Sequence, residues 1–512
     1  MRMVRWVVAW GAVCLLSTAG LAGEVEVRVD GRQTHQAYEG FGATTTTLVG
    51  AHGDSLGQPL RAKVLEAVYG QVKITMGNLN VGPLESPAGW EKLRNDNDDP
   101  HAIDWTGFDL TQIEKMKELV LDPAGPMGFD HWSVAGNISW RWAAPWLGEL
   151  YKKDRDRALE EAAEQVVAAV THWKKVTGEP PRLVHLFNEP TSGNREMIGA
   201  DLFAVRDAIK RVGARLEEAG FGTVRFVVPN EETVRRSIDA AKVILQDEGA
   251  RRYVAAIGYH CYPYGSAYAS VPKILGASGT GKPDERSVAE RRELRDLCRR
   301  YRVPAWMTEV SHSEVDPRSF DHLRGRAIHI HDEMVYADAS AFYGMNAYGD
   351  KKSYEAHFAG RLDGNPWLLG SDEIVEAINE DGSMLITGMG YAMGHYARWL
   401  TRGAVRLEAT SSDSLVQLTA WRDDTRGRLV LVVINNGKEG NTLSVGLAGV
   451  AVRGEVEGEQ SVERAYWRNL APTVVGPEGL RLQAPGMSVT TFSMHLTAVD
   501  PDRPGPAGGA AE

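Results

Sequence analysis

The sequence predicts an α/β protein with two domains, a (β/α)8 TIM barrel and an all-β sandwich built from the N-terminal strand and the C-terminal region. Three observations predict this fold. The 512 residues are enough for two or three ordinary domains. From about residue 38 to residue 400, short apolar runs alternate with amphipathic helices, as in parallel βα units. After residue 400, short alternating runs follow one another without helices, as in a sandwich.

The composition is that of an ordinary globular protein. Apolar residues make up 43% of the chain and charged residues 24%, which argues against a disordered or coiled-coil chain. The formal net charge of −11 is unfavourable for tracking phosphates, so we expect no nucleic-acid partner. Three cysteines in a chain of this length are too few for a disulfide scaffold.

The first residues have the pattern of a secretory leader. Arg2 and Arg5 precede the apolar run Trp6–Leu16, and the small residues of Ser17–Gly23 follow it. The run is shorter than the roughly 20 residues that span a bilayer. We therefore expect residues 1–22 to be a signal peptide cleaved after Ala22. The mature protein is expected to be secreted, extracellular or periplasmic, monomeric, and without integral membrane contact.

Eight strand-like runs lie in the predicted barrel, residues 37–398. Amphipathic helices separate most of them; one carries apolar residues from Leu159 to Trp173, and the next from Leu202 to Leu216 before Gly220. An open doubly wound sheet is the alternative, but no Gly-rich phosphate motif follows the first run. The runs are Tyr38–Thr44, Val72–Leu79, Phe129–Ala135, Leu183–Phe187, Val224–Val228, Val254–Tyr259, Ala305–Thr308 and Ala339–Met345.

The predicted sandwich draws on both ends of the chain. Val25–Val29 alternates apolar and polar residues before the barrel begins, so we expect residues 24–36 to join residues 399–496 in one module. The tail, residues 497–512, is rich in Pro, Gly and Ala and is expected to be disordered. The C-terminal strand-like runs are Val405–Glu408, Leu415–Trp421, Arg428–Asn435, Thr442–Leu447, Val462–Trp467, Leu480–Gln483 and Ser488–His495.

Two glutamates end strands of the predicted barrel. Glu189 lies between Asn188 and Pro190 at the end of the fourth run, and Glu309 ends the seventh. In a parallel barrel the carboxyl ends of the strands open into one mouth, where active sites lie. Either glutamate alone is more simply explained as a cap of the next helix. As a pair, they suit glycosidic cleavage, in which one carboxylic acid protonates the leaving oxygen and one carboxylate attacks the sugar.

At these residues the sequence resembles clan A glycoside hydrolases, and family 30 in particular. Asn188-Glu189-Pro190 matches the clan's strand-four motif, in which the Glu is the general acid/base and the Asn contacts the sugar 2-hydroxyl. Thr308-Glu309 matches the strand-seven nucleophile. The resemblance extends from Val25 to about His495. Five further stretches carry it: Tyr38–Ala43, Tyr259–Tyr262, Gly390–Trp399, Gly403–Arg406 and Pro485–Phe492.

This resemblance implies a retaining β-glycosidase that works by double displacement without a metal or organic cofactor. The implied substrate is a carbohydrate, a polysaccharide or glycoside of the glucan, galactan, xylan or glucosylceramide type. The sequence does not identify the sugar. Two alternatives remain open, a carbohydrate-binding barrel without turnover and a metal-dependent hydrolase, although the sequence offers no convincing set of metal ligands.

One position departs from the family pattern. Family 30 usually keeps an Arg at the end of strand two, hydrogen-bonded to the nucleophile, and here Asn78 lies about there. An amide hydrogen-bonds a carboxylate but does not offset its charge. His260 and Arg141 are the candidates for the missing positive charge.

The remaining predicted substrate-site residues are aromatic or imidazole side chains. We expect Tyr262 to donate to Glu309 and His260 to lie near Glu189; the alternative is an aromatic pair that only closes the barrel top. Trp140 and Trp142 follow the third strand and are expected to stack on a sugar ring.

Two other features are expected to be structural. The acidic run Asp96–Asp99 lacks the glycine and the distal glutamate of a calcium-binding EF-hand loop, so we expect a solvated turn. Cys298 lies at helical spacing with apolar residues and is expected to be a buried thiol, with a disulfide to Cys261 as the alternative.

Overall fold

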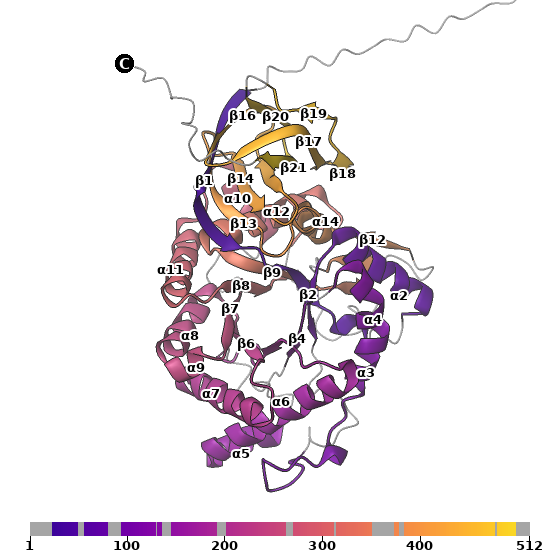
Figure 1. The fold of residues 1–512 in the computed structure, drawn as a ribbon, viewed down its shortest axis with the longest axis vertical. Helices are drawn as coiled ribbons and strands as arrows, with labels where there is room; N and C mark the ends of the chain where they lie inside the picture. Colours follow the sequence, from indigo (N-terminus) through magenta and orange to yellow (C-terminus); the bar gives the residue numbers. More distant parts are fainter. Residues whose placement is uncertain are drawn as a thin grey trace, which may run out of the picture.

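The chain folds into a barrel with a sheet domain beside it (Figure 1). The predicted leader, residues 1–22, and nearly all of the predicted tail lie outside the described residues. The computed structural model describes residues 23–49, 56–79, 94–129, 131–135, 145–191, 201–262, 270–311, 314–350, 373–377, 383–476 and 479–497.

Strands β2 to β9 close a parallel barrel in chain order, with β9 returning to pair with β2. The prediction of a TIM barrel is confirmed, and each predicted run overlaps one barrel strand. The strands are β2 (Gly40–Thr44), β3 (Met76–Leu79), β4 (His131–Ala135), β5 (Leu183–His185), β6 (Arg225–Glu231), β7 (Val254–His260), β8 (Ala305–Glu309) and β9 (Ala339–Asn346).

The start of the second predicted run is wrong. Val72 belongs to the π-helix η2 (Glu66–Val72), not to β3. Ala67, Val68, Tyr69 and Val72 are buried, so this segment packs one helical face against the core before the chain reaches the barrel wall.

Helices surround the barrel, and polar caps fix where the long ones begin. The Asp154 side chain accepts a hydrogen bond from Arg157 N at the start of α6, and Asp201 accepts from Phe203 N and Ala204 N at the start of α7. The helices are α2 (Gln58–Leu65), α3 (Thr111–Met116), α4 (Asp122–Ala124), α5 (Pro145–Lys153), α6 (Arg155–Thr177), α7 (Leu202–Glu218), α8 (Val234–Gln246), α9 (Glu248–Arg251), α10 (Val271–Gly279), α11 (Glu285–Tyr301), α12 (Phe320–Tyr336) and α14 (Gly388–Ala397).

The sheet domain combines the first described strand with the C-terminal strands. Strand β1 pairs parallel with β16 and antiparallel with β13, so the start of the described chain lies inside the C-terminal sheet (Figure 1). Val25, Val27 and Val29 of β1 enter its core. The strands are β1 (Gly23–Ala37), β13 (Val405–Ser411), β14 (Val416–Asp423), β15 (Arg428–Asn435), β16 (Asn441–Ala448), β17 (Ala451–Val462), β18 (Ala465–Asn469), β19 (Thr473–Val474), β20 (Leu480–Ala484) and β21 (Ser488–Thr497).

The predicted strand Val462–Trp467 is wrong. A turn with Arg464 at φ 64° separates β17 from β18 there, and β17 begins much earlier, at Ala451. Glycines and glutamates within Ala451–Val462 hide the alternation expected of a strand, because much of this strand is solvent-facing.

Strand β15 joins the two domains because both of its faces are buried. Leu429, Leu431 and Val433 belong to the core of the sheet domain. Val430, Val432 and Ile434 belong to the core that also contains residues of α12 and α14. The barrel and the sheet domain therefore share one strand as a common wall.

The two described cysteines are buried free thiols, so the alternative of a disulfide between Cys261 and Cys298 is wrong. A small sheet follows the barrel, made of β10 (Tyr348–Asp350), β11 (Val375–Ala377) and β12 (Met384–Ile386). Among the described residues, no helix has both the length and the apolar character that crossing a membrane requires.

Candidate active site

The two predicted glutamates meet at the mouth of the barrel. Glu189 follows β5, the fourth barrel strand, and Glu309 ends β8, the seventh. An oxygen of each carboxylate and a ring nitrogen of His260 all lie within 4.8 Å of one another. Glu189 is only 5% exposed, whereas Glu309 is half-buried. A deep carboxyl group and a more accessible one thus face a common space.

His260 ends β7 and Tyr262 follows it, and the two side chains hydrogen-bond different glutamates. His260 Nδ1 lies 2.9 Å from Glu189 Oε1 and 3.8 Å from Glu309 Oε1. The Tyr262 hydroxyl donates to Glu309 Oε1 at 2.7 Å and also lies 3.7 Å from Met345 Sδ. His260 therefore lies within 4 Å of both carboxylates, and Tyr262 lies beside Glu309.

Asn230, which the sequence did not single out, joins the ends of three strands. Glu189 has a positive φ of 51°, and its N–H donates to Asn230 O at 2.8 Å. The Asn230 side chain donates to Phe187 O at 3.2 Å and to Val227 O at 3.0 Å, and its Oδ1 accepts from Thr308 Oγ1 at 2.8 Å. Because Thr308 precedes Glu309, this one amide supports both glutamates.

Glu231 is a third carboxyl group, close enough to Glu189 to interact with its charge. Its side chain is fully buried at the end of β6, and Thr191 N donates to its Oε1 at 3.1 Å. Burial, with a smaller contribution from the charge of Glu189, raises the pKa of Glu231 to about 7. Its place in the run Asn230-Glu231-Glu232 after an apolar strand was the available sequence signal.

The other predicted substrate-site residues are only partly placed. Asn188 is half-buried beside Glu189, and Asn78 is half-buried near the end of β3. Asn78 Oδ1 is buried without a hydrogen-bond partner among the described residues, and no bond joins Asn78 to Glu309 there. Trp140, Trp142 and Arg141 lie outside the described residues. Of the two candidates for the missing charge, His260 is the one found near Glu309.

This arrangement can hold a carboxylate and a carboxylic acid in different surroundings. Tyr262 donates a hydrogen bond to the half-buried Glu309, while Glu189 is buried against an imidazole. Glu189, His260 and Glu309 also have the ligand atoms and spacing of a metal site. His260 Nδ1 already hydrogen-bonds Glu189 Oε1, and Glu309 Oε1 accepts from Tyr262, so the geometry fits acid–base chemistry more simply.

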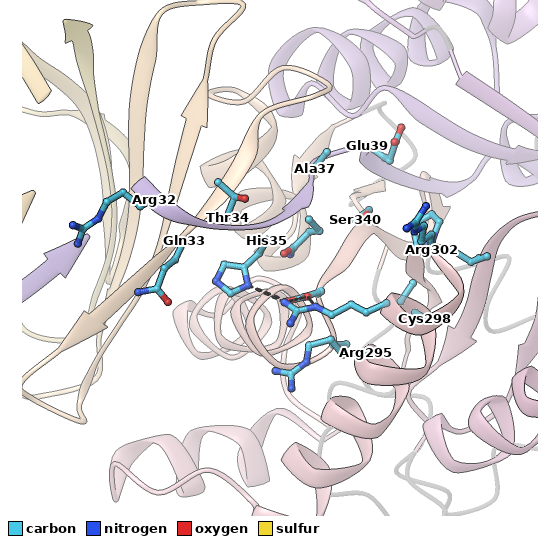
Figure 2. A pocket seen from close by; sticks show the side chains of 17 residues that line it. Arg32, Gln33, Thr34, His35, Ala37, Glu39, Arg295, Cys298, Arg302 and Ser340 are labelled. Atoms are coloured by element: carbon cyan, nitrogen blue, oxygen red, sulfur yellow. Dashed lines mark hydrogen bonds and ion pairs between the residues drawn. The ribbon is translucent and has the colours of Figure 1, made fainter. Parts of the chain in front are cut away.

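A cavity of about 680 Å³ lies at the other end of the barrel strands (Figure 2). Its lining includes Ala305 and Ser340 near the starts of β8 and β9, and it also includes His35 of β1. Arg299 lies in its wall, with its guanidinium 3.0 Å from His35 Nδ1. Because barrel active sites lie at the carboxyl ends of the strands, this cavity is separate from the glutamate pair.

Comparison with known proteins identifies the fold. No family model matches the chain. The glucuronoxylanase XynC of Bacillus subtilis is 27% identical over 232 residues, which cover 44% of this chain and 42% of that protein. A GH30 endoxylanase from Clostridium papyrosolvens C71 superposes with a TM-score of 0.61 at 17% identity, covering 92% of this chain and all of that one. The chain has the glycoside hydrolase family 30 fold. The resemblance expected from the sequence is thereby confirmed.

A second solved structure that superposes on this chain is a conserved exported protein from Bacteroides fragilis. It superposes with a TM-score of 0.66 at 14% identity and covers 91% of this chain and all of that one. The match to the curated xylanase spans less than half of that relative's length. The comparisons thus show the fold, and the activity and substrate of this chain are proposals.

Proposed function

We propose that this protein is a secreted, monomeric, retaining β-glycosidase whose catalytic residues are Glu189 and Glu309. The observation that carries the proposal is the carboxylate pair at the mouth of a family 30 fold, with oxygens within 4.8 Å of each other. Retaining enzymes hold their two carboxyl groups about 5–5.5 Å apart, whereas inverting enzymes leave room for water between them. Catalysis would reside in residues 37–398, with residues 24–36 and 399–496 as the sandwich.

The proposed reaction has two displacements. In the first, a Glu309 oxygen attacks the anomeric carbon while Glu189 gives its proton to the departing glycosidic oxygen, so the sugar becomes covalently attached to Glu309. In the second, Glu189 takes a proton from water, and the water oxygen displaces Glu309. Each carboxyl group returns to its starting protonation state, and the sugar keeps its anomeric configuration.

A β-linked polysaccharide is the proposed substrate class, with xylan as the first polymer to test. The support for xylan is the function named for the Bacillus relative and for the Clostridium structure. Asn188, Asn78, Trp140 and Trp142 are proposed to contact the sugar. The apolar leader of residues 1–22 supports export.

Two substitutions test the catalytic proposal. Glu309→Gln is expected to lower kcat at least about 10⁴-fold on every substrate, because the nucleophile is lost. Glu189→Gln is expected to abolish polymer hydrolysis but to retain activity on aryl glycosides whose leaving groups need no proton. Product anomers followed by NMR should show retention, and an inverted first product would contradict double displacement.

A matched control is Glu457→Gln, which removes a half-exposed carboxylate of the sheet domain and should leave kcat unchanged. Full activity of Glu309→Gln would rule out the proposed mechanism. Unchanged turnover after exhaustive chelation would argue against the metal-dependent alternative.

The alternative is a carbohydrate-binding barrel without turnover. It is supported by Asn78, which stands where family 30 usually has an arginine at the end of strand two. Asn78 cannot supply the positive charge of the usual arginine. Calorimetric binding of xylan oligosaccharides, without new reducing ends after prolonged incubation, would favour this alternative.

A further inference from the structure

Glu231 is a buried carboxyl group that the two proposed displacements do not use. It ends β6, the fifth barrel strand, and it pairs in register with Tyr259 of β7. Its side chain is fully buried, and the charge of Glu189 acts on it. A buried ionisable group costs free energy unless its surroundings satisfy it, and such groups concentrate at functional sites. Glu231 is therefore a candidate functional residue.

The Glu231 side chain holds the segment that carries Glu189. The N–H of Glu189 donates to Asn230 O at 2.8 Å. Pro190 has no N–H, so the next donor is Thr191 N, which donates to Glu231 Oε1 at 3.1 Å. The segment is thus bonded to the end of β6 on both sides of Pro190. The first of these hydrogen bonds joins backbone to backbone, whereas the second depends on the Glu231 side chain.

The segment needs support at this point because its backbone is strained. Glu189 has a φ of 51°, in the left-handed region that residues with a side chain rarely adopt. Such a conformation persists only where the surrounding structure enforces it. If Thr191 lost its acceptor, the Glu189 carboxyl group could move away from the glycosidic oxygen that it is proposed to protonate.

The hydrogen bonds of Glu231 suit a carboxylic acid better than a carboxylate. Oε1 accepts from Thr191 N, whereas Oε2 is buried and has no hydrogen-bond partner among the described residues. An ionised carboxylate offers about four acceptor positions, so an ion with so few donors would be poorly stabilised in the interior. A carboxylic acid is uncharged and carries its proton on one oxygen. Oε2 is the oxygen that accepts no bond.

The charges around Glu231 do not favour its ionised form. Arg236 of α8 attracts it, but the guanidinium of that residue bonds the carboxylate of Glu232 at 2.9 Å. The charge of Glu189 repels it. Burial is the largest influence and raises the pKa of Glu231 to about 7, although hydrogen bonds from Thr191 act in the opposite direction.

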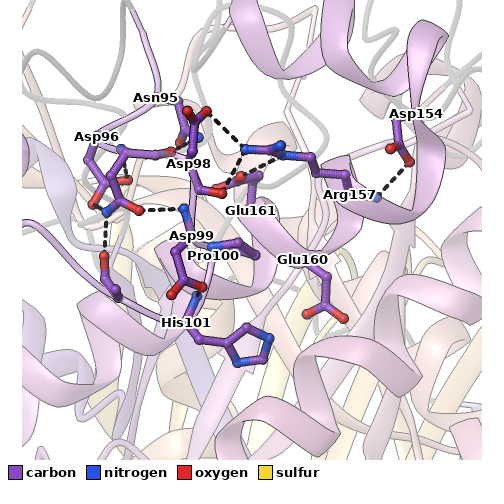
Figure 3. A network of polar contacts seen from close by, with 12 residues as sticks. Asn95, Asp96, Asp98, Asp99, Pro100, His101, Asp154, Arg157, Glu160 and Glu161 are labelled. Atoms are coloured by element: carbon purple, nitrogen blue, oxygen red, sulfur yellow. Dashed lines mark hydrogen bonds and ion pairs between the residues drawn. The ribbon is translucent and has the colours of Figure 1, made fainter.

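Glu161 of α6 shows what a buried glutamate looks like when an arginine lies against it. Glu161 is only 1% exposed, and Arg157 Nε donates to its Oε1 at 3.3 Å (Figure 3). Within the described part of the chain, no arginine or lysine hydrogen-bonds Glu231, and its printed donor is a backbone N–H. Glu161 is thus held by an ion pair, whereas Glu231 is held by an uncharged group.

An uncharged Glu231 also suits the proposed chemistry of Glu189. When Glu189 gives its proton to the leaving oxygen, it becomes a carboxylate. A second negative charge nearby would oppose this step, because like charges disfavour ionisation. A neutral carboxylic acid supplies the acceptor for Thr191 N without adding that charge.

We propose that Glu231, as a neutral carboxylic acid, is the positioning residue of the general acid/base Glu189, which it holds through the N–H of Thr191. This inference rests on the proposed function, since Glu231 has this task only if Glu189 donates a proton. Glu231 acts through Glu189 and not on Glu309. Its loss should therefore impair proton donation to the leaving group and leave nucleophilic attack intact.

Glu231→Met tests the proposal, because it removes the acceptor and keeps a side chain of similar length. The measurement is kcat/KM on aryl β-glycosides of the sugar that the wild type hydrolyses, with leaving phenols of graded acidity. For weakly acidic phenols, kcat/KM should fall about 10- to 100-fold, because these leaving groups need a well-placed proton. For 2,4-dinitrophenol it should change less than about threefold.

The matched control is Glu232→Gln, which changes the neighbouring carboxylate that bonds Arg236 at 2.9 Å. It should leave kcat/KM unchanged for every leaving group. Glu231→Gln is the rescue variant, because its amide oxygen can accept from Thr191 N and it carries no charge. At pH 6 it should keep kcat/KM within about threefold of the wild type on all of these substrates. If Glu231→Met does not fold, Glu231→Asp, which withdraws the carboxyl group by one methylene, should show the same selective loss.

An equal loss for all leaving groups, or no loss, in Glu231→Met or Glu231→Asp would overturn the proposal. A loss of more than about 10-fold in Glu231→Gln at pH 6 would overturn the neutral state, because an ionised carboxylate would then be needed. Glu189→Gln separates this inference from the proposed function. If Glu189→Gln shows no dependence on the leaving group, the proposed function fails. If it does and the Glu231 variants do not, only the inference about Glu231 fails.

Discussion

His260 ends β7 and Tyr262 follows it, but the two side chains hydrogen-bond different carboxylates. The Tyr262 hydroxyl bonds Glu309 at 2.7 Å, and His260 Nδ1 bonds Glu189 at 2.9 Å. A hydroxyl that donates to a carboxylate holds that carboxylate in one orientation. In the proposed mechanism this hydrogen bond orients the nucleophile.

Replacing Tyr262 tests this role. Tyr262→Phe removes the donor to Glu309 and is expected to lower kcat/KM about 10- to 150-fold, since a hydrogen bond to a charged group contributes about 1.5–3 kcal/mol. Steady-state kinetics on an aryl β-xyloside would measure the change. The matched control is Tyr69→Phe, whose hydroxyl is buried without a partner among the described residues. A Tyr262 variant with wild-type kinetics would contradict the role.

Glu231 should make stability depend on pH. The pKa of this carboxyl group is about 7 in the folded protein, whereas that of an unperturbed glutamate is 4.5. Between these values the unfolded chain ionises first, so the free energy of unfolding should fall by about 3 kcal/mol as pH rises from 4.5 to 7, and then level off. Urea titrations should show that Glu231→Gln lacks this fall. A fall of the same size in the variant would assign the effect to other groups.

The candidate site was predictable where a residue had a local signal. Glu189 and Glu309 end apolar runs, and His260 and Tyr262 follow one, so their common mouth could be inferred from the barrel alone. Asn230 gave no such signal, because an amide that joins the ends of three strands is recognised only once those strands are adjacent.

Residues of strands β6 and β7 determine the positions of Glu189 and Glu309. The Asn230 carbonyl oxygen on β6 accepts from the backbone N–H of Glu189, and its side-chain oxygen accepts from the hydroxyl of Thr308, the residue before Glu309. Gly258 on the adjacent β7 leaves the space that the Asn230 side chain occupies, since a Cβ added there would overlap Asn230 Oδ1. Gly258 of β7 thus leaves room for the Asn230 side chain, which supports the segments that carry Glu189 and Glu309.

Gly258→Ala should therefore disturb catalysis more than substrate binding. The methyl group would displace Asn230 and shift both carboxylates, lowering kcat roughly 10- to 100-fold, because small misplacements at an active site are costly. KM should change less than threefold in steady-state assays. Gly276→Ala is the control, because a Cβ at that position of α10 meets nothing within 4 Å. Equal kinetics in both variants would contradict this role of Gly258.

Element positions were predictable to the extent that burial follows a regular period. The barrel strands are buried runs, and each was located from its apolar residues. Val72 was assigned to the wrong element because an apolar residue at the end of a helix and one at the start of a strand look alike. Strand β17 was missed over most of its length because only four of its twelve residues are buried.

At the scale of the whole molecule, the barrel and the sheet domain share a buried interface. Besides β15, His395 of α14 contacts Thr491 Oγ1 at 3.0 Å and Ser461 Oγ at 2.8 Å, both in the sheet domain. Burial lowers the pKa of His395 to about 3, so this contact stays neutral at physiological pH. Two domains joined by one strand and a buried polar contact should unfold together.

Substitutions on the two faces of β15 test this cooperativity. Leu431→Ala, in the core of the sheet domain, and Ile434→Ala, facing the barrel helices, should each cost about 2–5 kcal/mol. Differential scanning calorimetry should show one transition that both variants lower. Val474→Ala, at a residue 64% exposed, should change stability by less than about 0.5 kcal/mol. Two resolved transitions, with Leu431→Ala lowering only one, would contradict a single unfolding unit.

Because Cys261 and Cys298 are buried, their thiols can be used to follow local opening of the barrel. Burial raises the pKa of both thiols, that of Cys298 to about 12, so neither is a thiolate at neutral pH. Alkylating reagents can reach these sulfur atoms only when the surrounding structure opens. Cys261 adjoins His260 of the candidate active site and Cys298 lies on the outer helix α11, so the chain carries two built-in reporters, one for each layer of the barrel.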